Sequence, residues 1–514
     1  MLTLIAGSRL LNPITPGNSS IHFQDTPPIP ESAFTTPKQQ QFNVALATMF
    51  YLCALPFAVV ESQAFREPFG LLAPGIRFPS RHSLSGDLLR RVREQIRERA
   101  VALTSKYTTA EVCHDCDRFM DKREPLDDHK LYGRVSGHLG RVIDEVESET
   151  GSVVAGVLSD NASNMSAAWE LLERTRPMFG GGCAAHMLNL LIQDVCQVDY
   201  FKAVQAKVLD ITSYVRDHHA VLSQFVTTLR ETSSSHRRAL VVPVCTRWNS
   251  LHACFLRIYE NKSVLKKLLT EPQFTALITR LASSKPAKLK LGRVKNSIGD
   301  SSFWRKLEQI IAFLDPMIEA LLELESDNCP TSRVNTRFHW LLNHPAYGSD
   351  DAPSELKAAI KKFIDARWSH VHTYTDATGL AFLLDPHTNL DYFVGSDETD
   401  TITQGCDFAE RRTLKEQILE TGGTYSNKKD YPLVWEIAKR VLAIPPSSAA
   451  SERAWSIMDF IHSKKRNRLT TDKVDMLAYI YVNHHAILKE GADWARLHSY
   501  PESCEALETD VTEQ

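Results

Sequence analysis

A carboxylate, a thiol and an imidazole lie close together in the sequence between residues 158 and 194. The apolar run at residues 153–158 is typical of a buried strand, and it is followed by Ser159 and then Asp160. Cys183 and His186 follow three glycines at C-x-x-H spacing and open a second apolar segment. These side chains can hold a metal or do acid–base chemistry. The same pattern also suits an ordinary corner, in which Asp160 caps a helix and His186 is a hydrogen-bonded core residue.

The elements around these residues can be predicted from periodicity. The apolar run would place Asp160 at the C-terminal end of a strand. Met165, Trp169 and Leu172 have the spacing of an amphipathic helix, and a second apolar helix would start near Cys183. The sequence therefore predicts a strand–helix–glycine–helix order around the candidate site.

Three further stretches occur at other points of the chain. Together with the central segment, they resemble the hAT superfamily of cut-and-paste DNA transposases and the genes derived from them. The resemblance covers about residues 45 to 485. The stretches are LPFAVVE at residues 55–61 with Phe65, Arg66 and residues 79–81; TRWNS at residues 246–250; and LAIPPSSAASERAWS at residues 442–456 with KRNRL at residues 465–469.

The resemblance implies an α/β fold. The expected core is ribonuclease-H-like, a mixed sheet flanked by helices and interrupted by a large all-helical insertion. In this family two aspartates and a glutamate hold two divalent metals, Mg²⁺ or Mn²⁺, that activate the attacking oxygen on a phosphodiester. Asp160 matches the second aspartate, and Glu452 matches the glutamate on a late helix. The glutamate could instead pair with a nearby basic residue on its helix.

The resemblance also implies residues around this centre. Cys183 and His186 match a C-x-x-H element beside the active site. Arg247 and Trp248 match a DNA-binding element whose tryptophan stacks on a flipped base. From its residue type alone, Trp248 could equally be a core aromatic.

The first family aspartate has no clear counterpart. It belongs to an Asp-Gly-Trp context, which this chain lacks, and the segment from Thr104 to Gly140 is short for three leading strands. We therefore expect a core truncated at its first strands. Two of three carboxylates would hold two metals poorly. The candidate aspartates, all in polar stretches, are Asp115, Asp117, Asp121, Asp127 and Asp128.

The C-terminal block has apolar helical faces and a basic cluster. The family pattern implies that this region completes the core and forms a homo-oligomer, while an intramolecular core is the alternative. The cluster is a candidate DNA-binding element and the only sequence support for the nuclear localisation that the resemblance implies. It comprises Lys464, Lys465, Arg466 and Arg468.

The net charge of the chain bears on whether it can bind nucleic acid. A net charge of −3 is unlike that of a free-standing nucleic-acid binder, so DNA contacts must come from local patches. Arginines between residues 90 and 99 alternate with glutamates, which favours a solvated helix face. Residues 283–295 are predicted to form a basic loop.

The uncharged run at residues 42–60 is long enough for a membrane span. The family has a soluble helix there, and we expect no membrane contact.

The sequence thus predicts six segments. They are a disordered arm (1–38), a helical region (39–105), the first part of the ribonuclease-H-like core (106–200), the helical insertion (201–395), the C-terminal core and dimerisation region (396–490) and an acidic tail (491–514).

The favoured function is that of a transposase-like protein without strand-transfer activity, acting through dimerisation and DNA binding. The first alternative is an active metal-dependent DNA transposase that uses a first carboxylate not located in the sequence. The second is a decayed remnant without a stable function.

Overall fold

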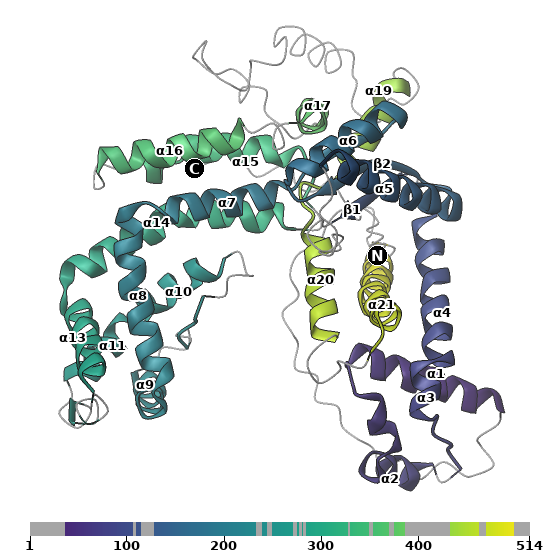
Figure 1. Cartoon of the computed structure of the whole chain (residues 1–514), viewed down its shortest axis with the longest axis horizontal. Helices are drawn as coiled ribbons and strands as arrows, with labels where there is room; N and C mark the ends of the chain where they lie inside the picture. Colours follow the sequence, from purple (N-terminus) through teal and green to yellow (C-terminus); the bar gives the residue numbers. More distant parts are fainter. Residues whose placement is uncertain are drawn as a thin grey trace, which may run out of the picture. The chain divides into compact units, whose positions relative to one another are not determined.

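The structure is a computed structural model. The chain folds into two compact units, the first made of Met1–Gly180 with Ser448–Gln514 and the second of Gly181–Ser447 (Figure 1). The structure describes residues 36–73, 75–105, 109–114, 128–232, 239–243, 249–270, 275–276, 280, 284–326, 329–348, 353–369, 375–385, 432–461 and 469–497.

The fold is predominantly helical, and the expected α/β ribonuclease-H-like class is wrong. Helices hold 79% of the described residues. The strands among those residues are β1 (Thr109–His114), β2 (Val153–Ser159) and β3 (Phe179–Gly182), in the order β1-β2-β3. β1 and β2 pair in parallel. The physical reason is periodicity, because most apolar residues recur at helical spacing and bury their faces against other helices.

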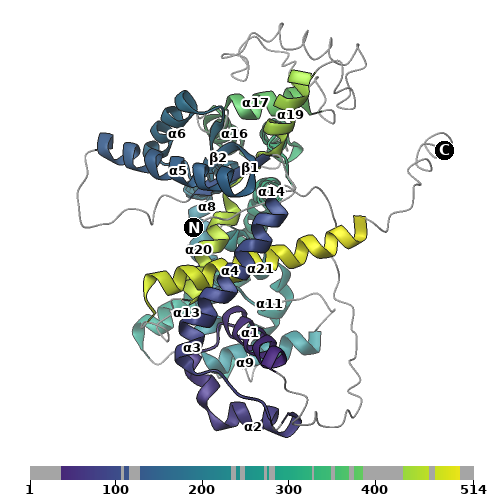
Figure 2. The ribbon, with the colours of Figure 1, turned by 90° about the vertical axis from the view of Figure 1, so that its right-hand side faces the viewer.

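Two helices pack with β2 in the first unit. They are α5 (Asp128–Thr150) and α6 (Ser163–Thr175), which contact each other closely (Figure 2). Their apolar faces form one core with Val154 and Val157 of β2. Residues 154–159 are all buried, as expected for a strand covered on both faces.

A second core of the first unit joins its two sequence segments. The helices α1 (Thr36–Leu52), α4 (Asp87–Thr104) and α21 (Thr471–Leu497) contact one another, and α20 (Ala449–Ile461) packs on α21 (Figure 1). Their buried residues belong to one apolar cluster. Between α1 and α4 lie η2 (Phe57–Glu61), α2 (Gln63–Leu72) and α3 (Arg81–Ser85).

The apolar run at residues 42–60 is divided between two elements. α1 ends at Leu52, Ala54 has a φ of +50°, and η2 starts at Phe57. The hydroxyl of Tyr51 donates a hydrogen bond of 2.7 Å to the backbone oxygen of Leu84, which fixes α1 on α3. In the described parts of the chain, no helix is both long and apolar enough to cross a bilayer.

Three of the arginines on α4 interact within the first unit. Arg90 pairs with Asp87 at 2.6 Å, and Arg97 pairs with Glu94 at 2.8 Å. The guanidinium carbon of Arg93 lies 5.2 Å from the ring centroid of Tyr479 on α21. These contacts give the three arginines a structural role at the helix surface.

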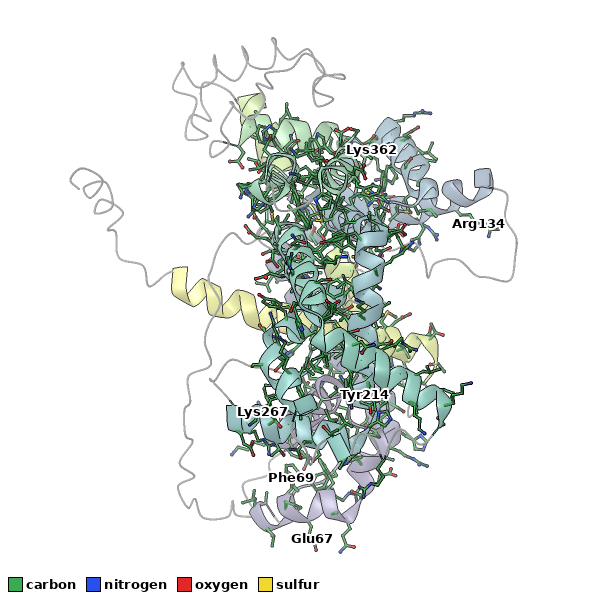
Figure 3. The ribbon with its side chains drawn as sticks, turned by 90° about the vertical axis from the view of Figure 1, so that its left-hand side faces the viewer. Glu67, Phe69, Arg134, Tyr214, Lys267 and Lys362 are labelled. Carbon is green, nitrogen blue, oxygen red and sulfur yellow. The ribbon has the colours of Figure 1, made fainter. Side chains whose placement is uncertain are left out.

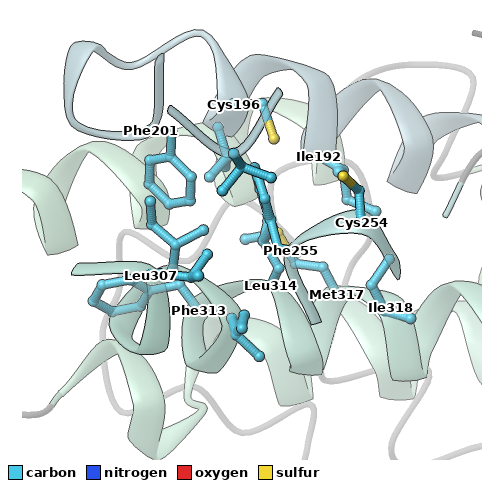
Figure 4. Packing of buried hydrophobic residues seen from close by; sticks show 14 of the residues in the cluster. Ile192, Cys196, Phe201, Cys254, Phe255, Leu307, Phe313, Leu314, Met317 and Ile318 are labelled. Atoms are coloured by element: carbon cyan, nitrogen blue, oxygen red, sulfur yellow. The ribbon is translucent and has the colours of Figure 1, made fainter. Parts of the chain in front are cut away.

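The second unit is built from helices around one large core. α14 is the central helix and packs against the helices before and after it in sequence. Figure 4 shows Phe201, Phe255, Leu307 and Phe313 meeting in this core. The helices are α7 (Ala184–Cys196), α8 (Asp199–Asp217), α9 (His219–Thr232), α10 (Ser250–Glu260), α11 (Lys262–Thr270), α13 (Lys285–Gly299), α14 (Ser301–Leu324), α15 (Arg333–Leu342), η3 (Pro345–Tyr347), α16 (Ser354–Trp368), α17 (Asp376–Leu384) and α19 (Pro432–Ala443).

Candidate functional site

Asp160 lies at the C-terminal end of β2, where the sequence places it. β2 ends at Ser159, whose hydroxyl donates a 2.9 Å hydrogen bond to the backbone oxygen of Asp160. The side chain of Asp160 is half-buried. The N-cap of α6 is Ala162, so Asp160 is not the residue that caps this helix.

Glu452 lies near the start of α20, in the same unit as Asp160. α20 contacts β1, and β1 is the neighbour of β2 in the sheet. Both α20, which carries Glu452, and β2, which ends before Asp160, thus lie next to β1. Among the described residues, no group of three or more His, Cys, Asp or Glu is placed to hold a metal ion. The side chain of Glu452 and four of the five candidate first aspartates lie outside the described residues, so the two-metal set stays a prediction, and we derive no metal-dependent step.

Several predicted site residues lie outside the described residues. Of the five candidate first aspartates, Asp128 is the first residue of α5 and the other four lie outside. The DNA-binding candidates outside are Arg247, Trp248, Lys464, Lys465, Arg466 and Arg468.

Cys183 and His186 mark the start of α7. Cys183 is the N-cap residue, and its Sγ accepts a hydrogen bond of 3.3 Å from the backbone N–H of His186. The cysteine is fully buried, whereas His186 is half-buried. An N-cap acceptor binds the N–H two or three residues later, so this spacing suits a helix start as well as a metal site. The observed hydrogen bond is an N-capping hydrogen bond.

The start of α7 also holds a segment from far along the chain. The backbone N–H of Ala184 donates to the oxygen of Pro446 at 2.9 Å, and Cys183 Sγ lies 3.4 Å from the hydroxyl oxygen of Ser447. The oxygen of Ile444 accepts a hydrogen bond from Thr331 at 3.3 Å. The glycine–cysteine motif and the Ile-Pro-Pro-Ser motif, which the sequence showed only as separate stretches, thus meet within the second unit.

A buried carboxylate lies elsewhere in the second unit. Asp385 is the C-cap of α17, is 7% exposed and accepts a hydrogen bond of 2.5 Å from the fully buried Ser332. In the sequence, Asp385 ends a short apolar run and precedes a proline. A buried polar group needs a hydrogen-bond partner, and this contact fixes the end of α17 near the start of α15.

The clearest perturbed carboxylate is Glu323 on α14. Its burial raises the pKa, but hydrogen bonds from Arg333 and Arg337 outweigh this and lower the pKa below its ordinary value. Arg333 Nε lies 2.7 Å from Glu323, and Arg337 also pairs with Glu319 at 3.1 Å. A partly buried carboxylate between two arginines is typical of a structural ion-pair network. We therefore interpret this cluster as a clamp between α14 and α15.

The cysteines with resolved pKa shifts are not reactive thiols. Burial raises the pKa of Cys196 to about 12 and that of Cys329 to about 12. Burial also raises the pKa of Cys254, against a smaller opposite effect of its hydrogen bond to Thr212. Since the thiolate is the nucleophile and metal ligand, these three residues stay inert near neutral pH.

One large aromatic side chain on α20 faces solvent. Phe460 is 61% exposed, although its neighbours Ile457 and Met458 pack against the apolar core of the first unit. Sequence periodicity did not single out Phe460. An exposed phenylalanine beside a packed face is a candidate for contact with another protein chain.

Two family models match separate parts of the chain. The model of the hAT family C-terminal dimerisation region matches residues 423–483, and that of the ZBED1 RNase-like helical domain matches residues 181–290. No curated protein matches the chain significantly. The first match covers α19, α20 and part of α21, and the second covers α7 to α11 and part of α13. The two matches confirm the resemblance noted in the sequence, since both parts of the chain are similar to parts of hAT-family, transposase-derived proteins.

Proposed function

We propose that this hAT transposase-like protein has lost strand-transfer activity and acts as a dimer that binds DNA. The dimerisation region at residues 423–483 is the observation that carries the proposal. Within that region, Phe460 on α20 is 61% exposed. Covering a phenylalanine of this kind contributes about 1.5–3 kcal/mol. We propose that a second copy of the chain covers it.

The dimer can be tested by sedimentation of the full chain. Phe460→Lys should shift the dimer–monomer equilibrium toward monomer by about tenfold or more. In the proposed dimer the second copy covers the ring, and the substitution would bury a charge in its place. Leu322→Lys is the matched control, since Leu322 is 51% exposed but lies on α14, outside the matched region. A parent chain that sediments as a monomer at all concentrations would overturn the proposal.

The loss of strand transfer is supported by the sequence. The chain has no Asp-Gly-Trp, and the candidate first aspartates lie in polar stretches. If the activity were retained, Mg²⁺ or Mn²⁺ would be the metal, and Asp160 and Glu452 would be two of its ligands.

Calorimetric titration with Mn²⁺ separates the two possibilities. We expect no binding by the parent chain. Binding that disappears in both Asp160→Ala and Glu452→Ala would instead support an active metal-dependent transposase. DNA cleavage would then be the next measurement.

DNA binding and nuclear localisation are further proposals. The basic cluster at residues 464–468 supports both, and the Arg-Trp pair at residues 247–248 supports the first. Replacing the four basic residues of the cluster by glutamine in a fluorescent fusion should reduce its nuclear fraction. An unchanged distribution would contradict the proposed localisation.

A further inference from the structure

α13 is the most basic helix of the second unit. Its residues 285–299 include four lysines and one arginine and no acidic residue. Residues 283–295 were expected to form a loop, but Ser284 caps a helix by accepting a hydrogen bond of 3.3 Å from the backbone N–H of Ala287, and Pro286 lies in the first turn. A proline there suits the start of a helix. The positive charges are therefore held on a rigid element.

One side of α13 is fixed to its own unit. Leu291, Val294 and Ile298 are buried in the large core. Arg293 pairs with Asp210 of α8 at 2.7 Å, and Lys290 lies 3.9 Å from Asp217 of the same helix. These two basic residues are thus already matched by acidic partners on α8.

A second side of α13 carries unmatched charge. Lys285 and Lys288 are exposed and Lys295 is half-buried. Their spacing places them on one helix face, which we call the lysine face. In the described residues, none of the three forms an ion pair with an acidic side chain. A Cβ added at Gly292, between them, would meet no atom within 4 Å. The space beside Gly292 is therefore open.

The dimensions of the lysine face suit a nucleic-acid backbone. Lys295 comes ten positions after Lys285, which corresponds to a rise of about 15 Å along the helix axis. One strand of duplex DNA presents about four phosphates over that length, at 3.4 Å per phosphate along the axis. Lysines are flexible point charges that contact phosphates without reading bases.

We propose that the lysine face, Lys285, Lys288 and Lys295, binds the phosphate backbone of duplex DNA without sequence preference. The inference builds on the DNA binding proposed above and adds the surface that provides it. Leu289, which is 59% exposed, lies at the edge of this face. An acidic protein partner would be expected to use it as an apolar anchor, whereas a phosphate backbone would not.

The experiment compares full-length variants by fluorescence anisotropy with two unrelated DNA duplexes at several salt concentrations. Lys285→Gln, Lys288→Gln and Lys295→Gln together should weaken binding to both duplexes equally, by about tenfold or more at 0.1 M salt. The slope of log affinity against log salt should fall by about one per lysine. The control replaces Lys357, Lys361 and Lys362 of α16 by Gln and should bind like the parent. Of these three lysines, Lys362 is labelled in Figure 3.

The outcomes separate this inference from the proposed function. If the parent binds DNA and the α13 triple variant binds equally well, the lysine face is wrong while DNA binding stands. If the parent binds no DNA, both fail, and the sedimentation result for the dimer is unaffected. Leu289→Ala should bind DNA like the parent. A loss equal to that of the triple variant would overturn the backbone-only contact, and circular dichroism would show that each variant is folded.

Discussion

The carboxylate of Glu323 should make stability depend on pH. Glu323→Gln should lower the free energy of unfolding by about 1–3 kcal/mol at pH 7, because Arg333 and Arg337 would lose a charged acceptor. A carboxyl whose folded-state pKa is lowered contributes fully above its ordinary value of about 4.5, and this contribution disappears as the pH falls through the folded-state pKa.

Urea unfolding at pH 7 and pH 4 measures this contribution. The parent and Glu323→Gln should differ less at pH 4 than at pH 7. Glu319→Gln is the control with a smaller effect, because Glu319 is 60% exposed. Equal differences at both pH values would contradict the assignment of the pKa shift to Glu323.

Gly180 is required where β3 passes α6. A Cβ at this position would lie 2.3 Å from the Cβ of Trp169 and 2.7 Å from its Cγ, so Gly180→Ala should destabilise the first unit by about 1–3 kcal/mol or more. Gly137→Ala on α5 should instead stabilise it by about 0.5–1 kcal/mol, since nothing lies within 4 Å of the added Cβ. Thermal unfolding should show a lower melting temperature for Gly180→Ala and a higher one for Gly137→Ala than for the parent.

The sequence predicted the place of Asp160 but not the role of Cys183. A buried apolar run that ends in a polar residue has few interpretations, so the strand end was predictable. The C-x-x-H spacing serves both a helix N-cap and a metal site, and sequence alone cannot separate them. The contact of Cys183 with Ser447 joins positions that no local pattern connects.

At the scale of the element, the start of α7 depends on one sulfur acceptor. Cys183→Ala should lower the free energy of unfolding by about 1 kcal/mol or more, because the N–H of His186 loses its acceptor. Cys183→Ser should cost less, since its hydroxyl can accept from His186 and contact Ser447. Chemical denaturation measures both values. A larger loss in the serine variant would contradict the capping role.

Element types followed from periodicity more reliably than the fold class did. The helix at residues 163–175 and the one after Gly182 were predictable from apolar spacing. Residues 283–295 were expected to form a basic loop, whereas residues 285–299 form a helix. The many lysines made the helical spacing of Leu291, Val294 and Ile298 hard to recognise. The α/β class was taken from the family resemblance, and only three short strands exist among the described residues.

At the scale of the whole molecule, the two units have separate cores. Every buried residue of the large core lies between Cys183 and Phe382, whereas the two smaller cores contain residues of the first unit. Cooperative unfolding usually follows such cores. We expect calorimetry to show two transitions.

Two core variants assign the transitions. Leu89→Ala should lower only the transition temperature of the first unit, and Phe338→Ala only that of the second. Each substitution should reduce the free energy of unfolding of its unit by about 2–5 kcal/mol. Both side chains are fully buried, each in the core of its own unit. One transition that moves equally in both variants would show that the units unfold together.

The discontinuous first unit has a consequence for protein synthesis. The apolar faces of α1 and α4 leave the ribosome early, but α21, which covers them, begins only at Thr471. At about 5–20 residues per second, these faces wait roughly 20–70 s for their partner. The continuous second unit can fold during that time. Nascent chains should therefore bind chaperones through α1 and α4 until α21 has been synthesised, and messages that end before α21 should give insoluble products.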